Sequence, residues 1–222
     1  MADLGEIGDR AAAVGLLPLG ALHPRRGDGA PPGTGTLVLL GPDEPGFWEH
    51  FRQAPEFGDG AGDPLDRWSA RVIGALAAGL GAAAVFPSDG PPWPPFTGWA
   101  RRSGQAWDSP VGLLVHARRG LFVSYRGALA LRERLVLPPP GRRPCDACAA
   151  PCVAACPVGA LTGAGYDLAA CHGFLDTAPG RDCLGRGCAV RRACPVGSGL
   201  RPESQSGFHM AAFHGRQASC DA

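Results

Sequence analysis

The chain has 222 residues, of which 45% are hydrophobic and 18% charged, enough apolar material for one large or two modest domains. All 21 of its basic residues are arginines. Chemistry that depends on lysine, such as Schiff-base catalysis or a phosphate-binding P-loop, is therefore excluded. The formal net charge of +1 predicts no overall field that would attract nucleic acid.

The N-terminal segment carries acidic residues where a secretory signal needs a basic region. The longest apolar stretch, residues 75–86, is interrupted by glycines. It is shorter than the roughly 20 residues that a membrane-spanning helix requires. These features predict a protein of the reducing cytoplasm that does not enter a membrane.

Residues 36–40 form a short apolar run between glycines and predict a buried strand, and residues 44–53 predict a short helix. A clearer helix starts with Asp63 as N-cap and Pro64 at its first position, and Gly81 suits its end. Its apolar residues recur every three or four positions, which predicts a buried face. They are Leu65, Trp68, Val72, Leu76 and Leu80.

Residues 82–86 predict a further strand, and another helix is expected to begin near Phe96. Residues 111–116 and 121–125 flank a turn with Gly120, a pattern typical of a β-hairpin. Helices mixed with a mainly antiparallel sheet indicate an α+β fold. The stiff Pro-rich segment 138–144 then predicts a linker between a first domain, 1–137, and a second, 145–222.

Cysteine is the strongest chemical signal in the second domain. None of the nine cysteines precedes residue 145, and eight lie between Cys145 and Cys194. A disulfide framework is expected in short secreted chains, and no export signal is predicted here. Metal ligation is the remaining interpretation, and Cys220 near the C-terminus is expected to be a free thiol.

Two Cys-Pro ends favour iron–sulfur ligation, and the eight thiolates divide into two sets of four. Ala-Cys-Pro-Val-Gly occurs twice, at 155–159 and 193–197. In two-cluster ferredoxins the Cys before such a Pro ligates the other cluster. This crossover predicts two [4Fe–4S] sites. Each half of the repeat contributes one cysteine to the cluster of the other half. One set is Cys145, Cys148, Cys152 and Cys194, and the other is Cys156, Cys171, Cys183 and Cys188. Four-thiolate zinc sites remain the alternative.

Residues 142–200 resemble the iron–sulfur module of epoxyqueuosine reductase and the corrinoid reductive dehalogenases. The shared features are a closely spaced Cys run that ends in Cys-Pro, then the isolated Cys171, then a last group that ends in Cys-Pro. The resemblance implies that two clusters pass electrons to a corrinoid held by a neighbouring domain. The corrinoid-binding Asp-x-His-x-x-Gly motif is absent.

The first domain resembles the cobalamin decyanase and dealkylase chaperone family. The similarity is carried by residues 36–40, by Asp63-Pro64-Leu65-Asp66 and by residues 111–131. It implies a nitroreductase-related fold that binds a corrinoid and uses flavin or glutathione. It also implies that Arg126, before Gly127, faces the bound cofactor. The alternative is that Arg126 pairs with a surface acid.

Several other residues are assigned structural roles. His116 at a strand end is expected to be a core or surface histidine, and Asp66 an exposed first-turn acid. Trp93 and Trp99 are expected to pack in the core or line a macrocycle pocket. Residues 208–213 predict a short amphipathic helix that docks on the protein, or that shields a cluster from solvent.

Together these features predict an iron–sulfur oxidoreductase that passes electrons through two [4Fe–4S] clusters to a corrinoid (cobalamin) or flavin in the first domain. The expected partners are a redox protein or that small molecule. Two alternatives stay open. One is a ferredoxin-type electron carrier whose first domain docks a partner, and the other is a zinc-stapled binding module.

Overall fold

The computed structural model describes residues 3–220, and for residues 216–220 only the backbone. The chain folds into two compact units. The sheet unit comprises Met1–Ala106 and Ser124–Gly141, and the cysteine unit comprises Trp107–Val123 and Arg142–Ala222. The predicted division at 138–144 treats each domain as one continuous segment, and it therefore assigns residues 107–123 to the first domain. In the structure these residues belong to the cysteine unit, so the chain crosses between the units three times.

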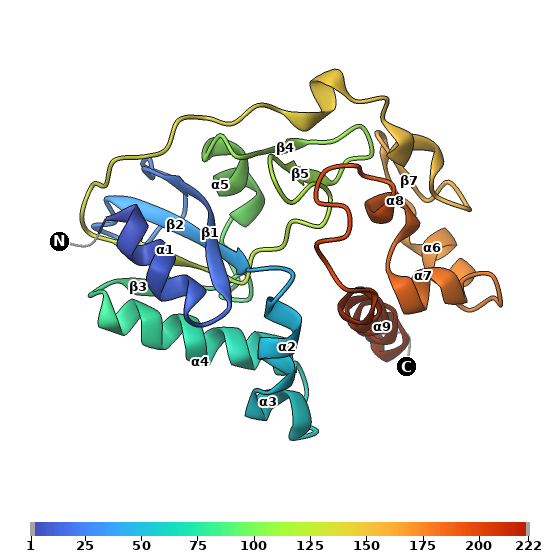
Figure 1. The fold of residues 1–222 in the computed structure, drawn as a ribbon, viewed down its shortest axis with the longest axis horizontal. Coiled ribbons are helices and arrows are strands. Elements are labelled where there is room, and N and C mark those ends of the chain that lie inside the picture. The colour runs from blue at the N-terminus through green and yellow to red at the C-terminus, as the bar shows by residue number, and fades with distance from the viewer. Residues whose placement is uncertain (1–2, 221–222) are drawn as a thin grey trace. The chain divides into compact units, whose positions relative to one another are not determined.

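The sheet unit is built on a four-stranded antiparallel sheet in the order β1–β2–β6–β3 (Figure 1). The strands are β1 (Leu16–Leu22), β2 (Thr36–Pro42), β3 (Ala83–Val85) and β6 (Gly127–Leu131). β2 is buried along its whole length, as an apolar inner strand should be. The predicted α+β class and the strands at 36–40 and 82–86 are therefore confirmed, whereas β1 and β6 are additional.

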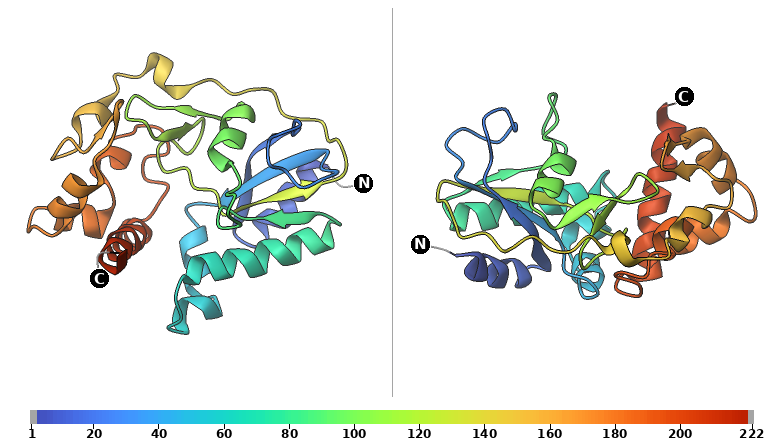
Figure 2. Two further views of the ribbon diagram at one scale, coloured as in Figure 1. Left: turned by 180° about the vertical axis from the view of Figure 1, so that it is seen from behind. Right: turned by 90° about the horizontal axis from the view of Figure 1, so that it is seen from above.

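Five helices complete the sheet unit: α1 (Leu4–Ala12), α2 (Phe47–Arg52), α3 (Pro55–Gly58), α4 (Pro64–Gly79) and α5 (Phe96–Arg102). The long helix α4 packs on β3 and β6 (Figure 2). Its Trp68 is almost fully buried, with its ring 5.4 Å from that of Phe47 and 5.9 Å from that of Phe51. The short helix, α4 and the helix at Phe96 are thus confirmed.

The start of α4 differs from the prediction, whereas its predicted face is confirmed at Leu65, Trp68 and Val72. Asp63 has a left-handed backbone with φ +48°, and its side chain makes no capping hydrogen bond in the described structure. The buried positions in the second half of the helix are Val72, as predicted, and also Ile73 and Ala77, whereas Leu76 is half-buried. By the 3.6-residue helical period Leu76 lies on the same face as Leu65 and Val72, so the predicted face is correct and Leu76 is only less deeply covered.

The cysteine unit consists of short elements. It contains the pair β4 (Ala106–Asp108) and β5 (Leu114–His116), the pair β7 (Leu161–Thr162) and β8 (Gly165–Tyr166), and the 3-10 turns η1 (Pro144–Ala147) and η2 (Pro151–Ala154). Its helices are α6 (Leu168–Leu175), α7 (Arg181–Arg186), α8 (Ala189–Arg192) and α9 (Glu203–Cys220). Within the described part of the chain, no helix has both the length and the hydropathy of a bilayer span.

The predicted hairpin at 111–125 is wrong. β5 pairs with β4, and only an isolated bridge joins His116 to Gly120. Gly120 has φ +52°, and a Cβ there would lie 2.0 Å from the carbonyl oxygen of Val196. The turn packs against the loop after Cys194, so the following residues are buried in the core of the cysteine unit instead of pairing as a second strand. Leu121 is 1% exposed.

Candidate metal centres

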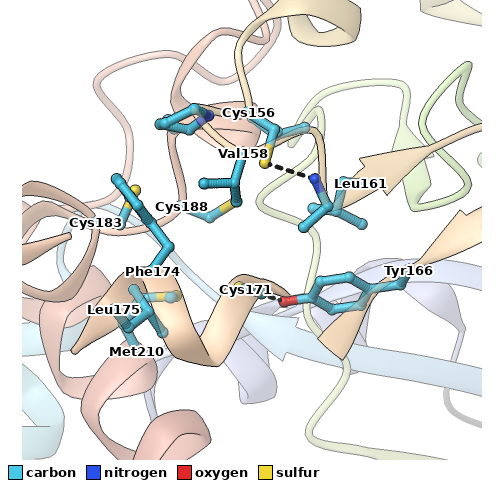
Figure 3. A pocket seen from close by; sticks show the side chains of 14 residues that line it. Cys156, Val158, Leu161, Tyr166, Cys171, Phe174, Leu175, Cys183, Cys188 and Met210 are labelled. Atoms are coloured by element: carbon cyan, nitrogen blue, oxygen red, sulfur yellow. Dashed lines mark hydrogen bonds between the residues drawn. The ribbon is translucent and has the colours of Figure 1, made fainter. Parts of the chain in front are cut away.

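The eight clustered cysteines line two cavities in the cysteine unit. The first cavity is lined by Cys145, Cys148, Cys152 and Cys194. The second is lined by Cys156, Cys171, Cys183 and Cys188 (Figure 3). Each cavity contains about 350 Å³ of space free of protein atoms, part of it open to solvent. The structure thus brings together the same two groups of four that the crossover arrangement predicts.

The wall of the first cavity comes from three parts of the chain. η1 and η2 present three of the thiols on consecutive tight turns, and Ala150 between them reverses the chain with φ +51°. The backbone N–H of Ala150 donates to Cys148 Sγ at 3.4 Å. Ser109 and Leu121 also line this cavity. They belong to residues 107–123, which are part of the cysteine unit although they lie between two sheet-unit segments in the sequence. The sequence does not indicate this contribution, because nothing in residues 107–123 resembles a ligand motif.

The second cavity is formed by β7, β8 and α6–α9. Cys156 Sγ accepts a hydrogen bond from the backbone N–H of Ala160 at 3.2 Å, and Cys171 Sγ accepts one from the Tyr166 hydroxyl at 3.2 Å (Figure 3). Cys183 lies on α7, and Cys188 is the N-cap of α8. The remaining lining is apolar and includes Met210 of α9.

The repeated Ala-Cys-Pro-Val-Gly segments have matching local structures. Each follows a short helical turn, η2 in the first copy and α8 in the second, and these two turns contact each other. Gly159 and Gly197, which end the two copies, both have left-handed backbones, with φ +63° and +71°. Cys156 and Cys194 each line the cavity that holds most of the other half's thiols. The sequence repeat therefore corresponds to an exchange of one cysteine between the halves.

The electrostatic environment disfavours free thiolates. Burial raises the pKa of Cys145, Cys152 and Cys171 above the ordinary thiol value. A raised thiol pKa is the opposite of what a nucleophilic cysteine needs, whereas a coordinating metal deprotonates a thiol outright.

The thiols of each cavity are not gathered around one point. A tetrahedral zinc site holds each sulfur about 2.3 Å from one point. Within the described residues, no group of three or more His, Cys, Asp or Glu side chains could hold one ion in this way. The four sulfurs of each set instead lie around the wall of a cavity. That arrangement suits a polynuclear cluster, in which each thiolate binds a different iron.

Helix α9 contains the predicted amphipathic segment and packs on α6 and α7. The ring of Phe213 stacks on His172 at 4.4 Å and on Tyr166 at 6.2 Å. His214 bridges His172 and Asp176, with both nitrogen–nitrogen and nitrogen–oxygen separations of 2.9 Å. With Met210 in the cavity lining, α9 covers part of the second cavity. The side chain of Cys220 lies outside the part of the chain that the structure describes. The expectation that it is a free thiol therefore stays a prediction.

Arg126 precedes β6 and forms an ion pair with Asp66 of α4, with Nη1 and Oδ1 3.3 Å apart. Its side chain is 17% exposed. This is the arrangement expected of the alternative, an arginine paired with a surface acid. Asp66 is exposed at the first turn of α4, as predicted.

The remaining candidates have structural roles. His116 is 1% exposed, and its Nδ1 accepts hydrogen bonds from the backbone N–H groups of Arg118 and Arg119. Trp99 is a core residue whose indole N–H donates to the carbonyl of Asp28. Trp93 is 62% exposed, so it does not pack in the core.

No protein-family model, curated protein or solved structure matches the chain.

Proposed function

We propose that the protein is an iron–sulfur electron-transfer protein that holds two [4Fe–4S] clusters in its cysteine unit. One observation carries the proposal: the eight clustered cysteines divide four and four between the linings of two cavities. Four thiolates are the ligand set of a [4Fe–4S] cluster. The resemblance of residues 142–200 to the iron–sulfur module of epoxyqueuosine reductase and the corrinoid reductive dehalogenases also supports two [4Fe–4S] clusters.

The surroundings of the thiols suit a redox centre. Each cluster, when bound, can take up and release one electron. The protein holds the ligands on short turns, excludes water with apolar residues such as Leu161 and Met210, and donates backbone N–H groups to sulfur at Cys148 and Cys156. Burial, charge and hydrogen bonds to sulfur are what set the potential of such centres.

The proposed electron acceptor is a corrinoid or a flavin bound by the sheet unit, which we place in the nitroreductase-related class on the resemblance described above. Arg126 is the residue proposed to contact it, because a planar, permanently charged guanidinium suits carboxylate or phosphate groups. Its ion pair with Asp66 favours a second candidate, an electron carrier whose sheet unit docks a partner protein.

Metal and sulfide analysis of anaerobically purified protein tests the clusters. We expect about eight irons and eight acid-labile sulfides per chain, four of each for each cluster, and a brown colour that bleaches with dithionite. The Cys194→Ser variant should lose up to half of the iron. Cys220→Ser, which changes a cysteine outside both sets, should lose none. A colourless protein that contains zinc and no sulfide would overturn the proposal.

Titration with cobalamin and with flavin separates the enzyme from the carrier. In the enzyme, Arg126→Ala weakens binding, whereas Asp66→Asn strengthens it because the guanidinium is released from its ion pair. Arg52→Ala, which removes an exposed ion pair with Glu49, is the matched control. If neither ligand changes its spectrum at micromolar protein while both clusters are present, the carrier is the correct function.

A further inference from the structure

Each of the two cavities contains one side-chain hydroxyl, and the two hydroxyls come from unrelated parts of the chain. In the second cavity this group is Tyr166, at the end of β8. Its hydroxyl donates to Cys171 Sγ, with the two atoms 3.2 Å apart (Figure 3). The ring lies nearly parallel to that of Phe213 on α9, with the two centroids 6.2 Å apart.

In the first cavity the hydroxyl belongs to Ser109, which is 7% exposed. Its Oγ is buried and finds no hydrogen-bond partner among the described residues. A buried hydroxyl without a partner has lost its hydrogen bonds to water without replacing them, so native structures rarely keep one. The backbone around Ser109 is fixed, because its N–H donates to Leu113 and its carbonyl accepts from Gly112. The hydroxyl is therefore held at the cavity wall by a tight turn.

We infer that Tyr166 and Ser109 are hydrogen-bond donors to the sulfur atoms of the two clusters, one donor for each cluster, and that they raise the reduction potentials. The inference rests on the proposed function. A hydrogen bond to sulfur withdraws electron density from the cluster, and the reduced form carries one more negative charge. The donor therefore stabilises the reduced form more than the oxidised form.

The inference makes Tyr166 and Ser109 positioning residues that act on separate centres. Removal of either hydroxyl should lower one potential and leave the other unchanged. We expect the reduced fraction of the affected cluster to fall about tenfold at a fixed applied potential, which corresponds to about 59 mV for a one-electron couple. The double variant should show both shifts.

Potentiometric titration followed by electron paramagnetic resonance measures both midpoints on the full-length protein. The variants are Tyr166→Phe, which keeps the stacked ring, and Ser109→Ala. The chain has only two tyrosines. Tyr125→Phe, which removes a buried hydroxyl in the sheet unit, is therefore a matched control that should leave both midpoints unchanged. Iron and sulfide are measured on every variant, so that loss of a cluster is not mistaken for a shift.

The outcomes separate this inference from the proposed function. If the wild-type protein contains no iron or sulfide, the proposed function fails. If both clusters are present and either variant leaves both midpoints where they are, the inference is wrong while the clusters stand. The same holds if the two variants shift the same midpoint. Support requires that each variant lowers a different midpoint at unchanged iron content.

Discussion

The sheet unit and the cysteine unit are stabilised in different ways. The sheet unit has a core of aliphatic and aromatic side chains, such as Trp68 and Phe47, packed against a four-stranded sheet. In the cysteine unit, thiols are themselves part of the core: Cys152 and Cys194 belong to one buried cluster with Val115, Leu121 and Val190. The first unit is therefore specified mainly by hydrophobic patterning, and the second, if the proposed function is right, by the positions of its cysteines.

The largest difference between the two units is expected when the metal is removed. Binding of a structural metal contributes directly to folding when the site does not exist in the unfolded chain. Anaerobic chelation of iron should therefore abolish hydrogen-exchange protection in α6–α9 and in residues 107–123, while β2 and β6 stay protected. Mass spectrometry of exchange in the full-length chain measures both regions in one experiment. Equal loss of protection in the two units would contradict the difference drawn here.

The next largest effect is expected at Gly120, in the turn against Cys194. A Cβ there would lie 2.0 Å from the carbonyl oxygen of Val196 and 2.9 Å from Cys194 Sγ. Gly120→Ala should displace Cys194 and lower iron content by up to half. Gly159→Ala is the control: its φ of +63° is also left-handed, but a Cβ there has no other atom within 4 Å. If both variants lose iron equally, backbone strain and not the close approach is responsible.

The fold of the sheet unit is easier to predict from the sequence than the fold of the cysteine unit. β2 and α4 were found because their apolar residues follow strand and helix patterns without interruption. β6 was missed because Gly127-Ala-Leu-Ala-Leu131 has small residues that carry little strand signal, and its neighbours β2 and β3 are remote in sequence. The hairpin failed for a tertiary reason, since the turn at Gly120 packs against the loop after Cys194.

At the candidate site, the two Cys-Pro ends and the crossover typical of two-cluster ferredoxins predicted which four cysteines line each cavity. The residues around them were not predictable. Ser109 is 36 residues before Cys145 in the sequence and has no motif of its own. Tyr166 is five residues before Cys171. This spacing could have indicated a contact, but only the β7–β8 turn and the packing of α9 direct its hydroxyl to the sulfur.

A substitution in the core of the sheet unit should have the opposite effect: it should destabilise the sheet unit and leave the cysteine unit unchanged. Trp68 is 1% exposed and packs edge-on to Phe47 and Phe51. Large-to-small changes at such positions cost about 3–5 kcal/mol. Trp68→Ala should lower the free energy of unfolding of the sheet unit by about this amount, while iron content at 4 °C is unchanged. Denaturant unfolding followed by far-ultraviolet circular dichroism measures the loss. Iron loss in parallel with unfolding would show that the two units are not independent.

The smallest effect is expected from the ion pair of Glu56 and Arg71 in the sheet unit. The Glu56 side chain is 9% exposed, and its oxygen accepts from Arg71 Nε at 2.5 Å. The hydrogen bond from Arg71 is the main cause that lowers the pKa of Glu56 from 4.5 to about 2, and Arg67 adds to it. The stabilisation is therefore fully present above about pH 4.5 and is lost as the pH falls towards 2.

Glu56→Gln should cost about 1–2 kcal/mol at pH 7, less than the pKa shift alone implies, because Arg71 is half-exposed and the pair is partly screened. The difference in unfolding free energy between wild type and variant should shrink between pH 4.5 and 2, because the wild-type carboxylate becomes protonated there. Glu49→Gln, at an exposed pair with Arg52, should change stability by less than about 0.5 kcal/mol at either pH. A difference that persists unchanged to pH 2 would show that Glu56 acts through packing and not through its charge.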